Sequence, residues 1–192
     1  MKTIVCLGDS ITYGYDNHSK MSNYTQVETP YPAALQNLLG DNYQIINSGN
    51  TGWQAKQVVN HLNELVYKYE PEKVILMLGI NDARGSKQGL PVTKNSYYRT
   101  MKKIIEALLD RDIEVLLLTP TPVRSPRVKS FNKVALALAH DLKINYVDMH
   151  QAIFRELKKD ELSLKDILAD RIHLSQAYYI KLAEIVSKEF GK

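Results

Sequence analysis

The chain has 192 residues, of which 44% are hydrophobic and 24% are charged, and its formal net charge at pH 7 is +4. This length and composition are typical of one globular domain spanning residues 1–192, with a core large enough to fold without disulfides. The basic residues are scattered and no segment reaches the roughly 20 apolar residues that cross a bilayer, which argues against nucleic-acid binding and membrane insertion.

The chain contains one cysteine, Cys6, which lies inside the first apolar run. A lone cysteine cannot form a disulfide within the chain, which suits a reducing compartment, and we interpret Cys6 as a small buried apolar residue. The apolar run near the N-terminus is too short for the core of a signal peptide. We therefore expect a cytoplasmic protein, while the sequence indicates no particular oligomeric state.

Five short apolar runs rich in β-branched residues recur along the chain and predict β-strands. They are Thr3–Leu7, Tyr43–Ile46, Lys73–Leu78, Ile113–Leu118 and Ile144–Val147. Segments with the apolar spacing of helices lie between them. Continuous apolar strands that alternate with helices predict an α/β fold, in which helices cover both faces of a parallel sheet.

Four segments carry apolar residues at intervals of three and four, as expected for helices with one buried face. They are Val58–Tyr69, Tyr98–Leu109, Phe131–Leu142 and Gln176–Phe190, the last with Ser175 placed to cap it. Two polar stretches, 15–29 and 86–93, are predicted to be surface loops, and long loops of this kind are often functional.

A polar, glycine-containing segment follows each of the first three strands. These segments are Gly8–Thr12, Asn47–Gly52 and Gly79–Asp82. Because the carboxyl ends of parallel strands meet at one edge of the sheet, where open α/β sheets bind ligands, we expect the three segments to converge.

These segments contain the groups that a serine nucleophile requires, namely a hydroxyl, a base, a group that orients the base, and donors for an oxyanion. Ser10 supplies the hydroxyl, while the backbone N–H groups of Ser10 and Gly49 and the side-chain amide of Asn81 can serve as donors. Asp170 and His173 precede the last predicted helix. Their spacing allows the carboxylate to hold one ring nitrogen while the other faces the hydroxyl.

Four motifs in this order resemble those of the SGNH hydrolases, also called the GDSL esterase and lipase family. They are GDSIT from Gly8, NSGNTG from Asn47, GIND from Gly79 and DRIHLS from Asp170. The shorter stretches YPAAL and LTP also resemble the family. The resemblance implies a flavodoxin-like three-layer α/β/α sandwich with a five-stranded parallel sheet. It also implies hydrolysis of esters without a metal or other cofactor.

By this resemblance Ser10, Asp170 and His173 are catalytic, and Ser10, Gly49 and Asn81 form the oxyanion hole. The sequence departs from the family's usual pattern at two positions. Arg171 replaces a small residue and Ala177 replaces a frequent glycine. Both changes bear on the rim of the site, and therefore on the substrate, more than on catalysis.

Structural interpretations of some of these residues remain open. Ser10 can be a helix cap, and Asp170 and His173 can be a surface pair at a helix start. For Asn47 and Gly52 we favour turn roles. Asp82 is interpreted in the same way, as a turn or cap residue.

Other histidines are weighed against His173 as the base. His150 is the leading rival, because it follows the fifth strand and Asp148 stands two residues before it. The remaining three have no carboxylate at a strand end nearby and are interpreted as ordinary surface or half-buried residues. They are His18, His61 and His140.

The sequence therefore predicts a serine esterase that cleaves carboxylic esters, short acyl or acetyl esters above all, through an acyl-enzyme. Its expected partner is a small-molecule ester. Tyr13, Tyr15 and Arg84 lie near the predicted mouth, but they do not define the acyl and alcohol parts. Two alternatives are a non-catalytic glycan or acyl-group binding module and a metal-dependent phosphoesterase that uses the Gly-Asp and Asn-Asp pairs as ligands.

Overall fold

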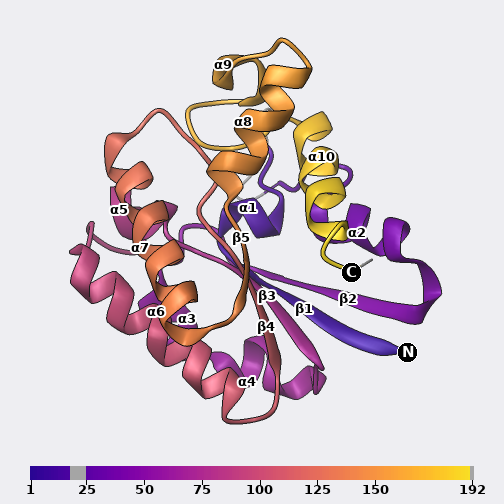
Figure 1. Cartoon of the computed structure of the whole chain (residues 1–192), viewed down its shortest axis with the longest axis vertical. Helices are drawn as coiled ribbons and strands as arrows, with labels where there is room; N and C mark the ends of the chain where they lie inside the picture. Colours follow the sequence, from indigo (N-terminus) through magenta and orange to yellow (C-terminus); the bar gives the residue numbers. More distant parts are fainter. Residues whose placement is uncertain (18–24, 191–192) are drawn as a thin grey trace.

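The computed structural model describes residues 1–17 and 25–190. Its centre is one sheet of five parallel strands in the order β2-β1-β3-β4-β5 (Figure 1). The strands are β1 (Lys2–Gly8), β2 (Tyr43–Gly49), β3 (Lys73–Met77), β4 (Glu114–Leu118) and β5 (Asn145–Val147). All five predicted strands are present, and the α/β class is confirmed.

Helices occupy every connection between the strands. Those before β5 are α1 (Ser10–Tyr13), α2 (Tyr31–Leu39), α3 (Ala55–Val59), α4 (Leu62–Leu65), α5 (Ile80–Arg84), α6 (Lys94–Leu109) and α7 (Pro126–Leu142). Those after β5 are α8 (Met149–Lys159), α9 (Leu164–Ile167) and α10 (Gln176–Ser187). Two short 3-10 helices, η1 (Gly40–Asn42) and η2 (Tyr67–Tyr69), complete the set.

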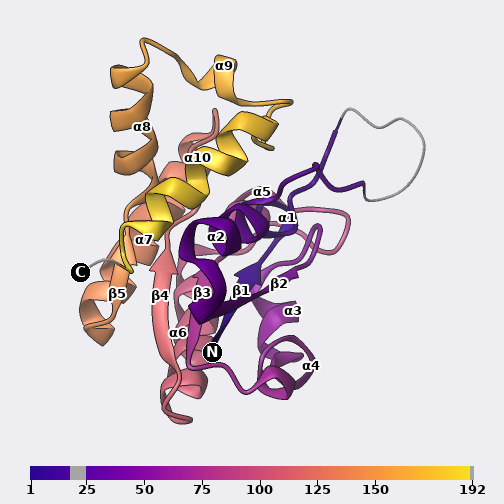
Figure 2. The same cartoon turned by 90° about the vertical axis from the view of Figure 1, so that its right-hand side faces the viewer.

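The helices form a layer on each face of the sheet. On one face α2 packs against α10 and β2, and on the other α3 and α7 pack against α6 (Figures 1 and 2). The short helices α1 and α5 follow β1 and β3 at the carboxyl edge, above which α8 and α9 lie (Figure 1). This is the expected three-layer α/β/α sandwich.

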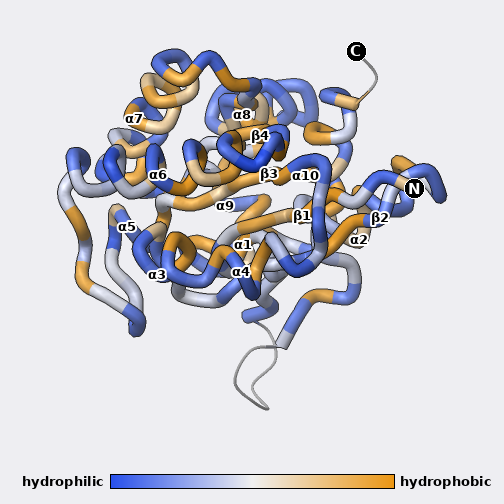
Figure 3. Tube along the Cα trace, turned by 90° about the horizontal axis from the view of Figure 1, so that it is seen from below, coloured by the Kyte–Doolittle hydropathy of each residue, from blue (hydrophilic) through white to orange (hydrophobic). Residues whose placement is uncertain are grey.

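The core lies between these layers. The central strands β1, β3 and β4 have neighbours on both sides and helices on both faces, so their residues are buried without alternation. The edge strands β2 and β5 are half exposed. Figure 3 shows the same arrangement as an apolar centre with hydrophilic segments outside it. Within the described residues, no helix is both long and apolar enough to cross a bilayer.

The prediction of a single helix over Val58–Tyr69 is wrong. The segment is broken into α3, α4 and η2, although Val58, Leu62 and Val66 are buried as their spacing indicates. The break is at His61, whose ring Nδ1 lies 2.8 Å from the carbonyl of Gln57 and competes for the acceptor that an α-helix would use there. Burial of the apolar face therefore survives the loss of a continuous helix.

Two other helices, α6 and α10, also differ in detail from the prediction. In α6, Tyr97 rather than Tyr98 joins the buried face, and Leu109 is 38% exposed. Tyr98 lies at the edge of that face, where its hydroxyl donates to Asp141. Ser175 precedes α10 as predicted, but its side chain forms no cap hydrogen bond among the described residues, and the helix ends at Ser187.

The three polar segments predicted to converge do lie together. Gly8 and Gly49 are register partners on β1 and β2, and the side chain of Asn81 donates to the carbonyl of Trp53 at 2.9 Å. Of the predicted loop 15–29, residues 18–24, which include His18, lie outside the described residues. The described ends of this loop pair through an antiparallel bridge between residues 15 and 26.

Candidate active site

Ser10 lies at a tight turn between β1 and α1. Asp9, and not Ser10, caps the helix, since its Oδ1 accepts the N–H of Ile11 at 2.9 Å. A Cβ at Gly8 would collide with Thr12 and with the carbonyl of Met77, so the turn requires glycine at that position. The Ser10 hydroxyl is thus not used as a cap, and its N–H belongs to the first turn of a helix, where N–H groups have no partner inside the helix.

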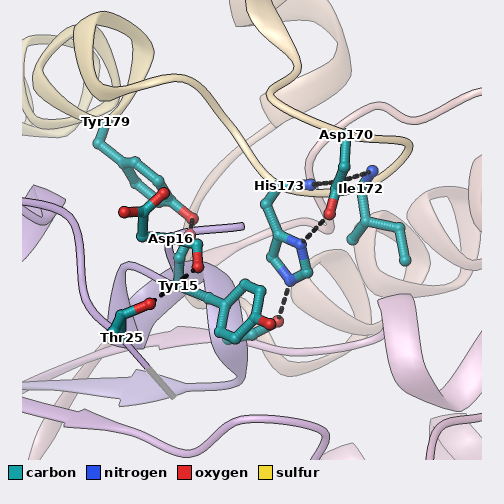
Figure 4. Close-up of polar contacts among 8 residues, drawn as sticks. Tyr15, Asp16, Thr25, Asp170, Ile172, His173 and Tyr179 are labelled. Atoms are coloured by element: carbon teal, nitrogen blue, oxygen red, sulfur yellow. Dashed lines mark hydrogen bonds and ion pairs between the residues drawn. The ribbon is translucent and has the colours of Figure 1, made fainter. Parts of the chain in front are cut away.

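His173 contacts Ser10 across most of the chain. Its Nε2 lies 2.9 Å from Ser10 Oγ, and its Nδ1 lies 2.8 Å from Asp170 Oδ2 (Figure 4). An ionised carboxylate can only accept hydrogen bonds, so Nδ1 carries the ring proton. In a neutral ring Nε2 is then the acceptor for the serine hydroxyl, which is the arrangement of a serine, a base and an orienting carboxylate.

The loop that carries this pair is held by Asp170 itself. Its Oδ1 accepts the backbone N–H groups of Ile172 and His173 at 2.6 and 2.7 Å (Figure 4). Burial raises the pKa of the Asp170 carboxyl, but the hydrogen bonds from the His173 ring and from these N–H groups outweigh burial and leave the pKa below its ordinary value. The carboxylate is therefore ionised when it orients the ring.

Three further contacts join this loop and the start of α10 to the N-terminal part of the chain. Gln176 exchanges hydrogen bonds with the backbone N–H and carbonyl of Thr29. The ring of Tyr15 lies 4.6 Å from the His173 ring, centroid to centroid, and the hydroxyl of Tyr179 donates to the carbonyl of Tyr15 (Figure 4). Tyr15 thus limits the positions available to the imidazole.

Gly49 was predicted to be an oxyanion donor, and its N–H already has a hydrogen-bond partner. Its N–H donates to Asn47 Oδ1 at 3.0 Å, which is the Asx turn expected for Asn47. A Cβ at Gly49 would collide with the backbone of Tyr13, so this glycine allows β2 to pack closely against α1. Because the Gly49 N–H already donates to Asn47 at the end of the same strand, it is a poor candidate for an oxyanion donor.

Gly52, to which the sequence analysis assigned a turn role, lines the cleft together with Asn81 and His173. It has a φ of +80°, in the left-handed region that favours glycine, so the turn role holds as well. Its carbonyl accepts the hydroxyl of Ser86, which holds the turn in place. The cleft has a volume of about 370 Å³.

A buried glutamine fixes the position of Asn81 and was missed by the sequence analysis. The Gln54 side chain is fully buried, and its Nε2 donates to the carbonyl of Asn81 at 3.0 Å and to that of Leu90 at 2.8 Å. It stands two residues after the NSGNTG motif, but nothing in its local pattern distinguishes it from a surface glutamine.

Asp9 and Asp82 are both buried and have structural roles. The Asp82 carboxylate accepts the N–H of Ala55, so it caps α3, a different helix from its own. Burial raises the pKa of Asp9 to about 7, with repulsion from Asp82 adding to the effect, and burial raises the pKa of Asp82 to about 6. Within residues 1–17 and 25–190, no group of three or more His, Cys, Asp or Glu side chains is placed to hold a metal ion.

The carboxylate of the rival pair is engaged elsewhere. Asp148 caps α8 by accepting the N–H of Gln151, and it also accepts from the side chain of Asn132. His150 is half-buried in α8, and burial lowers its pKa. In the described part of the chain His150 forms no hydrogen bond with Ser10, so the structure brings His173, and not His150, to the serine.

Comparisons with known proteins agree with this geometry. A family model described as the GDSL-like lipase/acylhydrolase family matches residues 6–179. An acetylxylan esterase of Xylanibacter ruminicola is 26% identical over 219 residues, which are 96% of this chain and 42% of that protein. An acetylxylan esterase of Geobacillus stearothermophilus is 26% identical over 208 residues, which are 98% of this chain and 93% of that protein.

Solved structures show the same fold. A lipase/acylhydrolase from Enterococcus faecalis superposes with a TM-score of 0.79 at 25% identity, over 99% of this chain and 95% of that one. A catalytic mutant of the Geobacillus stearothermophilus acetylxylan esterase superposes with a TM-score of 0.83 at 22% identity, over 100% of this chain and 94% of that one.

Proposed function

Because the chain belongs to the GDSL-like lipase/acylhydrolase family, we propose that it is a serine esterase that releases short acyl groups, acetyl above all, from polar alcohols. The observation that carries this proposal is the hydrogen-bonded series from Ser10 Oγ through His173 to Asp170. The two acetylxylan esterases similar to this chain support acetyl esters of sugars as the substrate class.

The reaction follows from the positions of these groups. Ser10 Oγ attacks the ester carbonyl carbon while His173 Nε2 takes the hydroxyl proton. His173 then gives this proton to the oxygen of the leaving alcohol, and the acyl group remains on Ser10. A water molecule attacks the acyl-enzyme, its proton passes through His173 back to Ser10 Oγ, and the carboxylic acid is released. Asp170 keeps the proton-accepting nitrogen facing the serine throughout.

Three donors are assigned to the oxyanion that forms during each attack. They are the backbone N–H groups of Ser10 and Gly52 and the side-chain amide of Asn81. Gly52 replaces Gly49 in this set because it lines the cleft, whereas the Gly49 N–H is bonded to Asn47. The carbonyl of Trp53 accepts from the Asn81 amide and fixes its orientation.

The walls of the cleft favour a short acyl group. Besides Asp170 and His173, the cleft is lined by polar side chains such as Ser86, Lys87 and Gln88, and the large apolar ones are limited to Tyr15 and Ile172. A longer acyl chain gains about 0.8 kcal/mol per methylene only where apolar walls bury it.

The single buried cysteine, Cys6, is consistent with the cytoplasmic location expected above.

A panel of p-nitrophenyl esters tests the function. We expect kcat/KM to fall at least about tenfold from acetate to octanoate, because two large apolar side chains, Tyr15 and Ile172, are too few to bury all the added methylenes. A rise in kcat/KM with chain length would instead favour a lipase with an apolar acyl site.

Two further experiments, together with the ester panel, distinguish the esterase from the binding module and from the phosphoesterase. A fluorophosphonate probe should label Ser10 in a catalyst, whereas a binding module would neither turn over the esters nor be labelled. Hydrolysis that requires added divalent metal and is lost with a chelator would favour the phosphoesterase.

Replacing Asn81 with alanine tests the oxyanion assignment. We expect kcat for p-nitrophenyl acetate to fall by about 10²–10³, because one donor is removed from a preorganised site. Asn47→Ala is the matched control, since it removes an amide that holds the Gly49 N–H at the same edge of the sheet. An equal loss in both variants would overturn the assignment, because a general disturbance of this edge of the sheet would then explain it, and parent activity in Asn81→Ala would remove Asn81 from the set.

A further inference from the structure

A second cleft, with a volume of about 510 Å³, adjoins the active site. Its lining consists of Arg84, Arg124, Lys165, Leu168, Asp170 and Arg171. Asp170 lines both clefts, so the second one lies directly on the side of the carboxylate and its histidine. We call it the cationic cleft, because four of its six lining residues are basic.

The four cations reach this cleft from separate parts of the chain. Arg84 is the last residue of α5, Arg124 precedes α7, Lys165 lies in α9 and Arg171 follows Asp170 directly. All four side chains are exposed to solvent. A charged helix face produces such clusters from one element, whereas here the fold gathers them at one point of the sheet's carboxyl edge.

These cations lack carboxylate partners. In the described part of the chain, none of them forms an ion pair or a side-chain hydrogen bond, whereas Lys181, for example, pairs with Glu156 and Glu184. Gathering like charges without partners is unfavourable for folding. The cluster is therefore better explained by an anion that binds there.

Two nearby carboxylates offset part of this charge. Asp170 is bonded to His173 and to two backbone N–H groups. Asp166 is bonded to Ser163, and these bonds, followed by the charges of Lys165 and Arg124, lower its pKa. Four positive charges thus face two negative ones, which leaves the cluster with a net positive charge.

We propose that the cationic cleft binds an anionic group, a carboxylate or a phosphate, on the alcohol part of the substrate. This inference rests on the proposed function. The leaving alcohol must receive its proton from His173 Nε2. Asp170, on the Nδ1 side of the same ring, lines both clefts, so an alcohol part that extends past the ring reaches the cationic cleft. Guanidinium groups suit this role because they bind carboxylate and phosphate through paired N–H groups. The substrate is then an acylated acidic sugar or a similar acidic ester.

Three acetylated methyl glycosides test this inference directly. They carry the acetyl group at the same hydroxyl and differ only at C6, with a hydroxymethyl group in the glucoside, a carboxylate in the glucuronoside and a phosphate in the glucoside 6-phosphate. At low salt, the parent should show kcat/KM about tenfold higher for at least one anionic glycoside than for the neutral one. The anion preferred distinguishes carboxylate from phosphate as the natural group.

Two double variants with the same net charge supply the comparison. Arg124→Gln/Lys165→Gln should reduce the ratio of anionic to neutral kcat/KM at least about fivefold, whereas Lys103→Gln/Lys133→Gln, on α6 and α7, should leave it at the parent value. Using the ratio within each variant cancels any general loss of activity or stability.

The possible failures are distinguishable. Hydrolysis of the neutral glycoside and of p-nitrophenyl acetate without any preference for an anion would overturn this inference and leave the esterase intact. An equal fall of the ratio in both double variants would overturn it too, because net charge alone would then explain the preference. No hydrolysis of any ester would overturn the proposed function and this inference together.

Discussion

Replacing Ser10 with alanine should lower kcat for p-nitrophenyl acetate by about 10⁴–10⁶. The hydroxyl is the group that His173 Nε2 contacts at 2.9 Å, and no covalent acyl-enzyme forms without it. The residual rate comes from the oxyanion donors and from binding. Stopped assays with high enzyme concentration measure this rate, and the fluorophosphonate probe should no longer label the protein.

The fold should survive this change. Ser10 is 5% exposed, and alanine keeps the first turn of α1 because Asp9 supplies the cap. We expect the free energy of unfolding to change by about 1 kcal/mol or less, since one hydrogen bond to a partly accessible ring is lost. Parent activity in a folded Ser10→Ala protein would show that another group is the nucleophile.

Replacing Asp170 with asparagine should lower kcat by about 10⁴ through the tautomer of His173. The amide oxygen can still accept the N–H groups of Ile172 and His173, so the loop should keep its shape. The amide NH₂ would then face Nδ1, and two donors cannot bond. The ring would move its proton to Nε2 and lose the ability to accept the Ser10 hydroxyl proton. A pH profile of kcat and the nitrogen chemical shifts of the ring measure this change.

Asp148→Asn is the matched control for this variant. Asp148 stands two residues before His150 and caps α8, so its replacement alters the carboxylate of the rival pair. We expect kcat to stay within about twofold of the parent, with a loss of stability of about 1 kcal/mol from the weaker cap. A loss of activity in Asp148→Asn as large as in Asp170→Asn would restore His150 as the base.

The fold was predictable because its strands are simple. Residues 4–7 and 74–77 are buried on both faces of the sheet, so an uninterrupted run of apolar residues was enough to predict each strand. The segment after β2 was not predictable in the same way. Its apolar spacing fits one helix, but the ring of His61 takes up the carbonyl of Gln57, and this contact is invisible in a periodicity.

The candidate site was predictable as a set of motifs and less so as a set of atoms. Ser10, Asp170 and His173 lie as the spacing indicated. From the sequence we assigned the donor role to Gly49 and a turn role to Gly52, although either glycine can allow a close approach of backbone to substrate. The choice depends on where the Asn47 side chain points, which is a property of the folded turn.

The cationic cleft was beyond the sequence altogether. Its arginines and lysine appeared there as scattered charges, and Arg171 as a departure from a family pattern. Only the topology brings the end of α5, the residues before α7, the helix α9 and the loop that follows it to one place. A cluster of basic residues that come singly from several elements leaves no local pattern in the sequence from which it could be predicted.

The hydroxyl of Ser10 and the ring of His173 meet although 163 positions separate them along the chain. On the ribosome, the proposed nucleophile is therefore made long before its base. We expect a growing polypeptide to remain inert toward esters until the loop before α10 has emerged and Gln176, the first residue of α10, has docked onto Thr29. A cut that releases Asp170 and His173 therefore removes the proposed base and leaves the Ser10 hydroxyl without this contact.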